Sequence, residues 1–174
     1  METVTRTGPL SGYRVLDLAG PLGLHCTKLL ADMGADVIKI EAPSGDESRR
    51  IPPFKDDTPH PEKSLYFLHF NTNKRSITLD VEKPDGRAVF LELVRKADVI
   101  LETARPGRMD ELGIGYPTLR AQNSGLVYAA ITPFGQTGPW RDYKANDMAG
   151  IALGNLLYLA GEPGEPPLQF LPRR

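Results

Sequence analysis

The sequence lacks the residues that would mark an oxidised, metal-bound or membrane-spanning protein. Cys26 is the only cysteine among 174 residues, which excludes an intrachain disulfide and a cysteine-based metal site. The three histidines are scattered and match no metal spacing, so we predict no metal. The amino terminus has no signal-peptide pattern, and the longest apolar run, 148–160, is too short to span a bilayer. We therefore expect a soluble, cytoplasmic protein without a membrane partner.

An excess of charge of either sign is also lacking. The 21 basic and 22 acidic residues give a formal net charge of -1, and the two signs are interspersed. Binding to nucleic acid needs a basic face, so we expect no nucleic-acid partner. The hydrophobic content of 40% is ordinary for a globular protein, and the length suits one domain with a sizeable core.

Strand-like and helix-like segments alternate along the chain. Apolar or alternating runs predict strands over 13–18, 35–40, 76–81, 98–102 and 126–131. Helical spacing predicts helices over 24–33, 64–70, 109–112 and 116–122, and another that begins at Pro84. This order indicates an α/β fold with an open, mostly parallel, Rossmann-like sheet flanked by helices.

Two features near the first helix have alternative interpretations. Gly20-Pro21-Leu22-Gly23 follows the first strand, but it is G-x-x-G and not the G-x-G-x-x-G of dinucleotide-binding folds. A tight turn explains it as well as phosphate binding does. Cys26 falls within the amphipathic helix, and we interpret it as a core residue and not as a nucleophile.

Three other segments call for specific expectations. Five prolines in 42–63 argue against regular structure, and a connection of this length is typical of a lid or mobile segment. The stretch Phe70–Ser76 (FNTNKRS) is either a solvated turn or a site for an anion. The run 148–160 is apolar almost all round, so we expect a helix buried on every side, covered by a partner or by further sequence.

Taken together, five motifs in order resemble the amino-terminal part of the family III CoA-transferases, which include formyl-CoA transferase, carnitine CoA-transferases and α-methylacyl-CoA racemase. The motifs lie at 10–18 (LSGYRVLDL), 26–41 (CTKLLADMGADVIKIE), 70–80 (FNTNKRSITLD), 97–116 (ADVILETARPGRMDELGIGY) and 134–147 (FGQTGPWRDYKAND). The resemblance implies a CoA-binding α/β domain over 10–174, preceded by a flexible 1–9. It also implies CoA transfer from an acyl-CoA to a carboxylic acid acceptor through an aspartate nucleophile.

The resemblance also implies partners and site residues. The family forms interlocked dimers, so a homodimer or pairing with a complementary subunit is expected. Lys144 is expected to contact CoA phosphates, and Arg75 is placed within possible reach of one, although Asn73, Lys74 and Arg75 are expected mainly to shape their loop. The other positions expected to contact CoA are Pro21, Leu22, Leu79, Thr103 and Ala104.

Several positions depart from the family pattern. Ala42 and Glu111 stand where basic residues are usual, and Thr103 replaces an asparagine. Asn146 stands where racemases carry a catalytic histidine, which argues against racemase chemistry. The family's aspartate is expected just after the segment matching Pro166-Pro167, and residues 169–174 contain no acid. We therefore assign no catalytic residue and expect this chain alone to be inactive.

Two other functions fit the sequence less well. A non-catalytic CoA- or nucleotide-binding module that pairs with a full-length subunit is suggested by the apolar run 148–160. An NAD-dependent oxidoreductase rests only on the sheet pattern, because the glycine fingerprint is missing.

Overall fold

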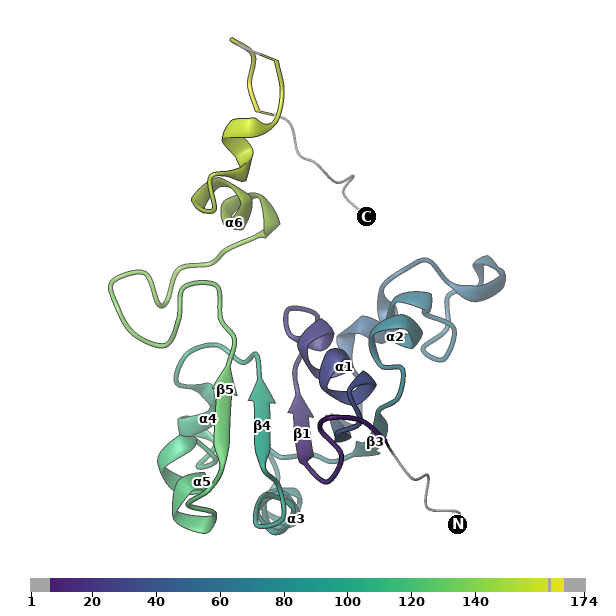
Figure 1. Ribbon diagram of the computed structural model, residues 1–174, viewed down its shortest axis with the longest axis vertical. Helices are drawn as coiled ribbons and strands as arrows, with labels where there is room; N and C mark the ends of the chain where they lie inside the picture. Colours follow the sequence, from purple (N-terminus) through teal and green to yellow (C-terminus); the bar gives the residue numbers. More distant parts are fainter. Residues whose placement is uncertain (1–6, 163, 168–174) are drawn as a thin grey trace. The chain divides into compact units, whose positions relative to one another are not determined.

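The computed structural model describes residues 7–162 and 164–167 (Figure 1). The flexible segment expected over 1–9 lies largely outside these residues. The chain divides into two compact units, one up to Thr132 and one from Pro133 onward. Each unit is described by itself, and a single domain over 10–174 remains a proposal.

The first unit contains a five-stranded sheet in which every pairing is parallel. The strand order is β3-β2-β1-β4-β5. This confirms the prediction of an open, parallel α/β fold. The strands are β1 (Arg14–Leu18), β2 (Asp36–Glu41), β3 (Arg75–Thr78), β4 (Val99–Glu102) and β5 (Val127–Ala130).

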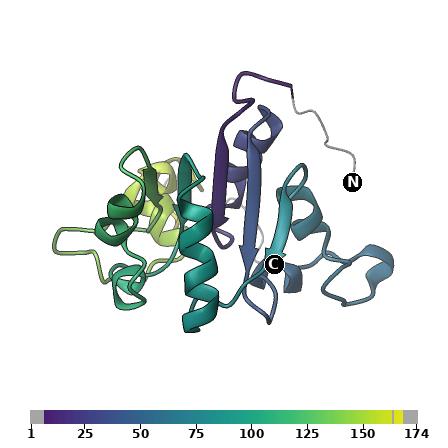
Figure 2. The ribbon, with the colours of Figure 1, turned by 90° about the horizontal axis from the view of Figure 1, so that it is seen from below.

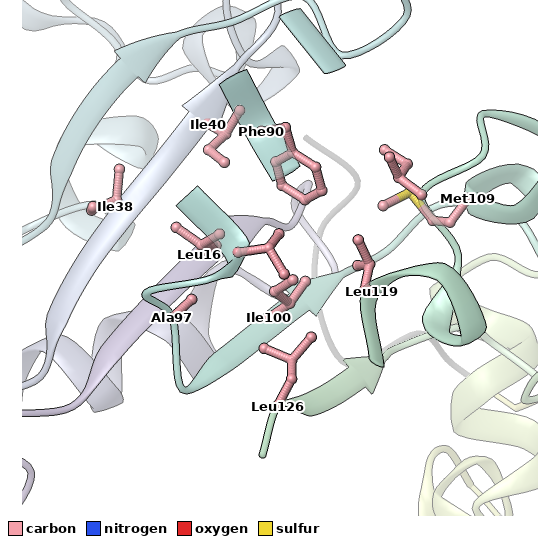
Figure 3. Close-up of a cluster of buried hydrophobic side chains, with 11 residues drawn as sticks. Leu16, Ile38, Ile40, Phe90, Ala97, Ile100, Met109, Leu119 and Leu126 are labelled. Carbon is pink, nitrogen blue, oxygen red and sulfur yellow. The ribbon is translucent and has the colours of Figure 1, made fainter. Parts of the chain in front are cut away.

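Helices cover both faces of this sheet, as Figure 2 shows for α3 in front and α1 behind. Successive strand residues point to opposite faces. Leu16 and Ile100 therefore pack with Phe90 of α3 in the larger core, drawn in Figure 3. Val15 and Val37 pack with Ala31 of α1 on the other face. The helices of this unit are α1 (Leu24–Asp32), α2 (Leu65–Phe70), α3 (Pro84–Val94), α4 (Arg108–Glu111) and α5 (Tyr116–Gln122).

The prediction that Cys26 is a core residue is wrong, because its side chain is exposed. The buried stripe of α1 consists of Leu24, Thr27 and Ala31. Cys26 lies off this stripe. The stripe includes a polar residue, Thr27, so apolar spacing alone does not identify the buried face of the helix.

The segment 42–63 contains regular turns, against the prediction. Two short 3-10 helices, η1 (Glu47–Arg50) and η2 (Lys55–Asp57), lie within it. The buried Ser64 hydroxyl, at the start of α2, donates to the carbonyls of Ser48 (3.0 Å) and Ile51 (2.6 Å). The first half of this segment is therefore fixed to the helix that follows it.

The second unit contains α6 (Asp147–Leu153) and the 3-10 helix η3 (Leu156–Leu159). The expectation of one continuous helix over 148–160 is wrong, because α6 ends at Leu153 and η3 is a separate 3-10 helix. No residue of either element is buried by the described residues, and the expected cover by a partner or by further sequence stays a prediction. Asn155 has a left-handed backbone (φ 64°) that separates the two elements. Within 7–162 and 164–167, no helix has the length and apolar character needed to cross a membrane.

Candidate ligand-binding site at the carboxyl edge of the sheet

The candidate site lies where β1 and β4 end side by side. After β1 the chain continues into α1, which packs on one face of the sheet. After β4 it continues into α4, which packs with α5 against the larger core on the other face. In open α/β sheets, ligands bind at this point where the strand order reverses. Of the predicted site residues, Pro21 and Leu22 follow β1, and Thr103 and Ala104 follow β4. The structure therefore brings these four positions to the carboxyl edge of the sheet, beside the ends of β1 and β4.

A direct hydrogen bond joins the two loops. The Gly20 N–H donates to the Thr103 hydroxyl oxygen at 2.8 Å. Thr103, which stands where the family usually has asparagine, thus serves as a link between the loops. Gly23 begins α1 directly against β4, since a Cβ at Gly23 would lie 2.8 Å from Thr103 Cγ2 and 2.8 Å from Ala19 Cβ. The G-x-x-G motif is explained by a tight turn and close packing.

We expect Gly23→Ala to destabilise the fold by about 1–3 kcal/mol, because the new methyl group clashes with Thr103 and Ala19. Urea unfolding measures this loss. Gly125→Ala is the matched control, since its Cβ would have no atom closer than 3.7 Å. Equal stability of the two variants would contradict this packing.

Glu102 lies at the end of β4 and is only 3% exposed. Its Oε2 accepts from the Ala104 N–H at 2.5 Å, and its Oε1 accepts from the Tyr128 hydroxyl at 3.2 Å. Burial raises the pKa of Glu102, and these hydrogen bonds offset part of the rise. Among the described residues no cation pairs with it. In the sequence, Glu102 is distinguished only as a charged residue at the end of the strand predicted over 98–102.

A polar hollow of about 300 Å³ lies at the ends of β2 and β3. Its walls include Glu41, Ala42, Arg49 and Thr78. Leu79, the next residue after Thr78, is half-buried and donates its N–H to the Glu41 carbonyl at 2.8 Å. The structure therefore places Leu79 on the same edge as the ends of β1 and β4, with β2 between them.

Lys74 does not provide a free charge for an anion. Its ammonium group is 1% exposed and contacts Asp17 Oδ2 at 2.9 Å, with Asp17 itself fully buried. It also donates to the Thr27 hydroxyl at 2.7 Å and to Asn71 Oδ1 at 2.9 Å. Burial lowers the pKa of Lys74, and Asp17 opposes this effect. The stretch Phe70–Ser76 (the asparagine turn) thus directs Lys74 toward the face of the sheet that α1 covers.

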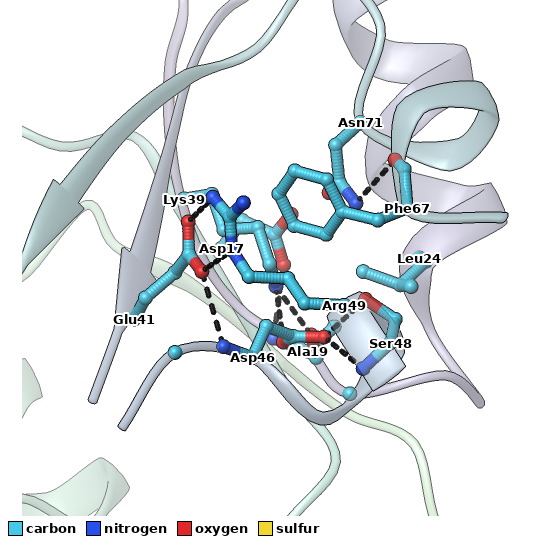
Figure 4. Close-up of polar contacts among 12 residues, drawn as sticks. Asp17, Ala19, Leu24, Lys39, Glu41, Asp46, Ser48, Arg49, Phe67 and Asn71 are labelled. Carbon is cyan, nitrogen blue, oxygen red and sulfur yellow. Dashed lines mark hydrogen bonds and ion pairs between the residues drawn. The ribbon is translucent and has the colours of Figure 1, made fainter. Parts of the chain in front are cut away.

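Two further ion pairs fix the segment after β2 (Figure 4). Lys39, 1% exposed, contacts Asp46 Oδ2 at 2.9 Å. Glu41 forms a bidentate pair with Arg49 at 2.6 and 2.9 Å, and the Arg49 guanidinium lies 3.7 Å from the Phe67 ring centroid. Burial alone would raise the pKa of Glu41, but the hydrogen bonds from Arg49 and other donors lower it to about 2.

Glu41 occupies the position at the end of β2 where dinucleotide-binding folds place an acid for the ribose. Here both carboxylate oxygens are already bound by Arg49, and the Ser76 hydroxyl also donates to Oε1. This arrangement, together with the missing glycine fingerprint, argues against an NAD site.

Arg75 lies apart from the other predicted site residues, at the amino end of β3. Its guanidinium binds both oxygens of Asp36, at 2.9 and 2.6 Å, and Arg14 contacts the same carboxylate at 2.9 Å. Asp36 begins β2, so this cluster lies at the amino edge of the sheet. The structure does not bring Arg75 to the carboxyl edge.

Lys144 lies in the second unit and is exposed. Asn146, which stands where racemases carry a histidine, accepts from the Ala149 N–H at 2.9 Å and caps α6. This is a structural role for the asparagine.

Near the β4–α4 loop, Glu111 binds Arg105 through both carboxylate oxygens at 2.7 and 2.6 Å. This pair partly neutralises the cation next to Thr103 and Ala104. Among the described residues, no group of three or more histidine, cysteine or acidic side chains is arranged to hold a metal ion. The absence of a metal from the functional protein remains a prediction.

The fold is an α/β domain with a five-stranded parallel sheet, and the candidate ligand site lies at the carboxyl ends of its strands. The CoA-transferase family III profile matches residues 10–172, and the chain belongs to this family. The resemblance inferred from the five motifs is thereby confirmed.

Individual relatives agree with this assignment. The chain is 42% identical to the succinyl-CoA:(R)-benzylsuccinate CoA-transferase subunit BbsE of Thauera aromatica, over 91% of this chain and 39% of that protein. It is 44% identical to acetyl-CoA:oxalate CoA-transferase of Acetobacter aceti, over 92% of this chain and 40% of that protein. The crystal structure of a CAIB/BAIF family protein from Brucella suis superposes with a TM-score of 0.86 at 37% identity, covering 95% of this chain and 44% of that one. The chain thus spans about two fifths of the length of these curated relatives.

Proposed function

We propose that this chain is the CoA-binding part of a transferase that moves CoA from an acyl-CoA to a carboxylic acid acceptor. The observation that carries the proposal is the edge where Pro21, Leu22, Thr103 and Ala104 meet at the strand-order reversal, in a chain of this family. Leu79 borders the same edge. Lys144, an exposed residue of the second unit, is included because the family resemblance implies its contact with the CoA phosphates.

Calorimetric titration of the protein with CoA tests this proposal. We expect saturable binding that Lys144→Ala weakens about tenfold, because a charge-assisted contact to phosphate is lost. Lys96→Ala is the matched control, since Lys96 lies before β4 at the opposite edge of the sheet. Folded protein that binds no CoA would overturn the proposal. Equal weakening by both variants would overturn the role of Lys144.

Among the residues proposed to contact the ligand, Arg75 has the least structural support. Its pairing with Asp36 at the amino edge supports the structural role expected for its loop. We retain a phosphate contact only as the less favoured proposal for this residue.

We further propose that this chain alone binds CoA without transferring it, because residues 169–174 contain no acid where the resemblance places the nucleophile. That segment lies outside the described residues. A homodimer of this chain would then bind CoA without supplying the nucleophile, whereas a complementary subunit would have to supply it. One of the relatives is named as a subunit, which supports the second arrangement. The single cysteine supports action in the cytoplasm.

A binding module without transferase activity is the second candidate. The exposed apolar residues Leu153, Tyr158 and Leu159 of the second unit favour it, because a partner that covered them would complete the fold. Sedimentation of the chain with and without a full-length family member tests this candidate, and a chain that stays monomeric in both samples would contradict it.

A further inference from the structure

Glu102 is a buried acid that no function described so far explains. It is 3% exposed, and no described cation compensates it. Removing a carboxyl group from water is costly unless its oxygens are hydrogen-bonded. Both oxygens are bonded here, one to a backbone N–H and one to a phenol. The question is which of these two contacts requires the acid.

The backbone contact lies within the candidate site. Glu102 Oε2 accepts from the N–H of Ala104, two residues further along, at 2.5 Å. Between them, Thr103 accepts from the Gly20 N–H at 2.8 Å. The turn after β4 is thus fixed in two ways. Thr103 links it to the first loop, and Glu102 holds its Ala104 N–H.

The phenol contact lies away from the ligand edge. Tyr128 is in β5, in register with Ile100 of β4, and packs against the larger core. Its oxygen lies 3.2 Å from Glu102, a longer contact than that to Ala104. Burial, and then the neighbouring Glu102 charge, raise the pKa of Tyr128, so the phenol stays protonated and donates. Tyr128 therefore supports Glu102 without shaping the loop.

We propose that Glu102 is a positioning residue for the CoA site, which sets the Thr103–Ala104 turn by holding the Ala104 N–H. The inference rests on the proposed CoA binding. An ionised and a protonated carboxyl group can both accept this hydrogen bond through an unprotonated oxygen, more strongly when ionised. What the site requires of the side chain first is its reach, and a neutral acceptor of the same length keeps the contact.

Two substitutions separate reach from charge. Glu102→Gln keeps the length, since its amide oxygen accepts from Ala104 and its NH₂ donates to the Tyr128 oxygen. Glu102→Asp keeps the charge but is one methylene shorter and loses Ala104. We expect CoA affinity within twofold of wild type for Gln and about tenfold weaker for Asp. Tyr128→Phe leaves Ala104 bonded and should also bind within twofold.

Hydrogen exchange of the Ala104 amide, followed by NMR, provides a second readout. We expect protection in wild type and in Glu102→Gln, and faster exchange in Glu102→Asp without a matching change at core amides such as that of Ile100. Weak binding by the Gln variant, wild-type binding by the Asp variant, or loss of binding in Tyr128→Phe would each overturn the proposal. If wild type binds no CoA, the proposed function fails, and the exchange rates still decide whether Glu102 holds the turn.

Discussion

Lys74→Ala is expected to lower the free energy of unfolding by about 3–5 kcal/mol, because it leaves the carboxylate of Asp17 buried without its cation. The Thr27 hydroxyl and the Ala19 N–H still donate to Asp17, at 2.8 and 2.9 Å, but neither carries a charge. Urea unfolding at pH 7 measures the loss.

Lys63→Ala is the matched control for this prediction. Lys63 contacts Asp56 at 3.6 Å, and both side chains are substantially exposed, at 35% and 66%. An exposed pair of this kind contributes less than about 1 kcal/mol. If Lys74→Ala cost no more than Lys63→Ala, the lysine would not have the structural role assigned to it, and the anion-binding interpretation of the asparagine turn would return.

Arg49→Met is expected to destabilise the protein by about 3–5 kcal/mol at pH 7 and by progressively less as the pH falls. The pKa of Glu41 is held at about 2 in the folded protein, against an ordinary value of 4.5. The stabilisation that Glu41 provides is therefore complete above its ordinary pKa and is lost as the pH falls through about 2. Once Glu41 is protonated, the guanidinium keeps its pair with the exposed Glu62 at 2.9 Å and its contact with the Phe67 ring, but loses the buried ion pair.

Unfolding curves at pH 7, 5 and 3 measure this convergence between wild type and Arg49→Met. Arg50→Met is the neighbouring control, because Arg50 is exposed and, among the described residues, its side chain donates only to the Ser44 carbonyl at 3.2 Å. A difference between wild type and Arg49→Met that stayed constant with pH would show that lost packing on Phe67, and not the ion pair with Glu41, dominates the effect.

The sheet was predictable from the sequence because the residue pattern within each strand indicates a strand. Residues such as Val37, Ile38 and Ile40 form a nearly continuous apolar run, as a strand covered on both faces requires. The positions of Pro21, Leu22, Thr103 and Ala104 at one edge follow from that topology, since parallel strands end together.

The polar interior was not predictable, because its partners are distant in sequence. Asp17 and Lys74 are 57 residues apart, and nothing local to either one indicates burial. The ion pairs of Lys39 and Glu41 likewise fix the segment 42–63, whose prolines had suggested a lid. The break within 148–160 was also missed, because apolar composition predicts a surface that needs a cover but does not show the left-handed backbone of Asn155 between α6 and η3.

The three ion pairs at the carboxyl ends of β1 and β2 also limit how this protein can be redesigned. Asp17–Lys74, Lys39–Asp46 and Glu41–Arg49 each join a strand to a different loop residue, and each strand partner is at most 5% exposed. A single substitution in one of these pairs leaves a buried charge without its partner, so both members of a pair must be exchanged together. Leu22, Leu79 and Ala104 are apolar, so substituting one of them leaves no charge unpaired. A library that tests the proposed CoA contacts should vary these apolar positions and keep the charged residues unchanged.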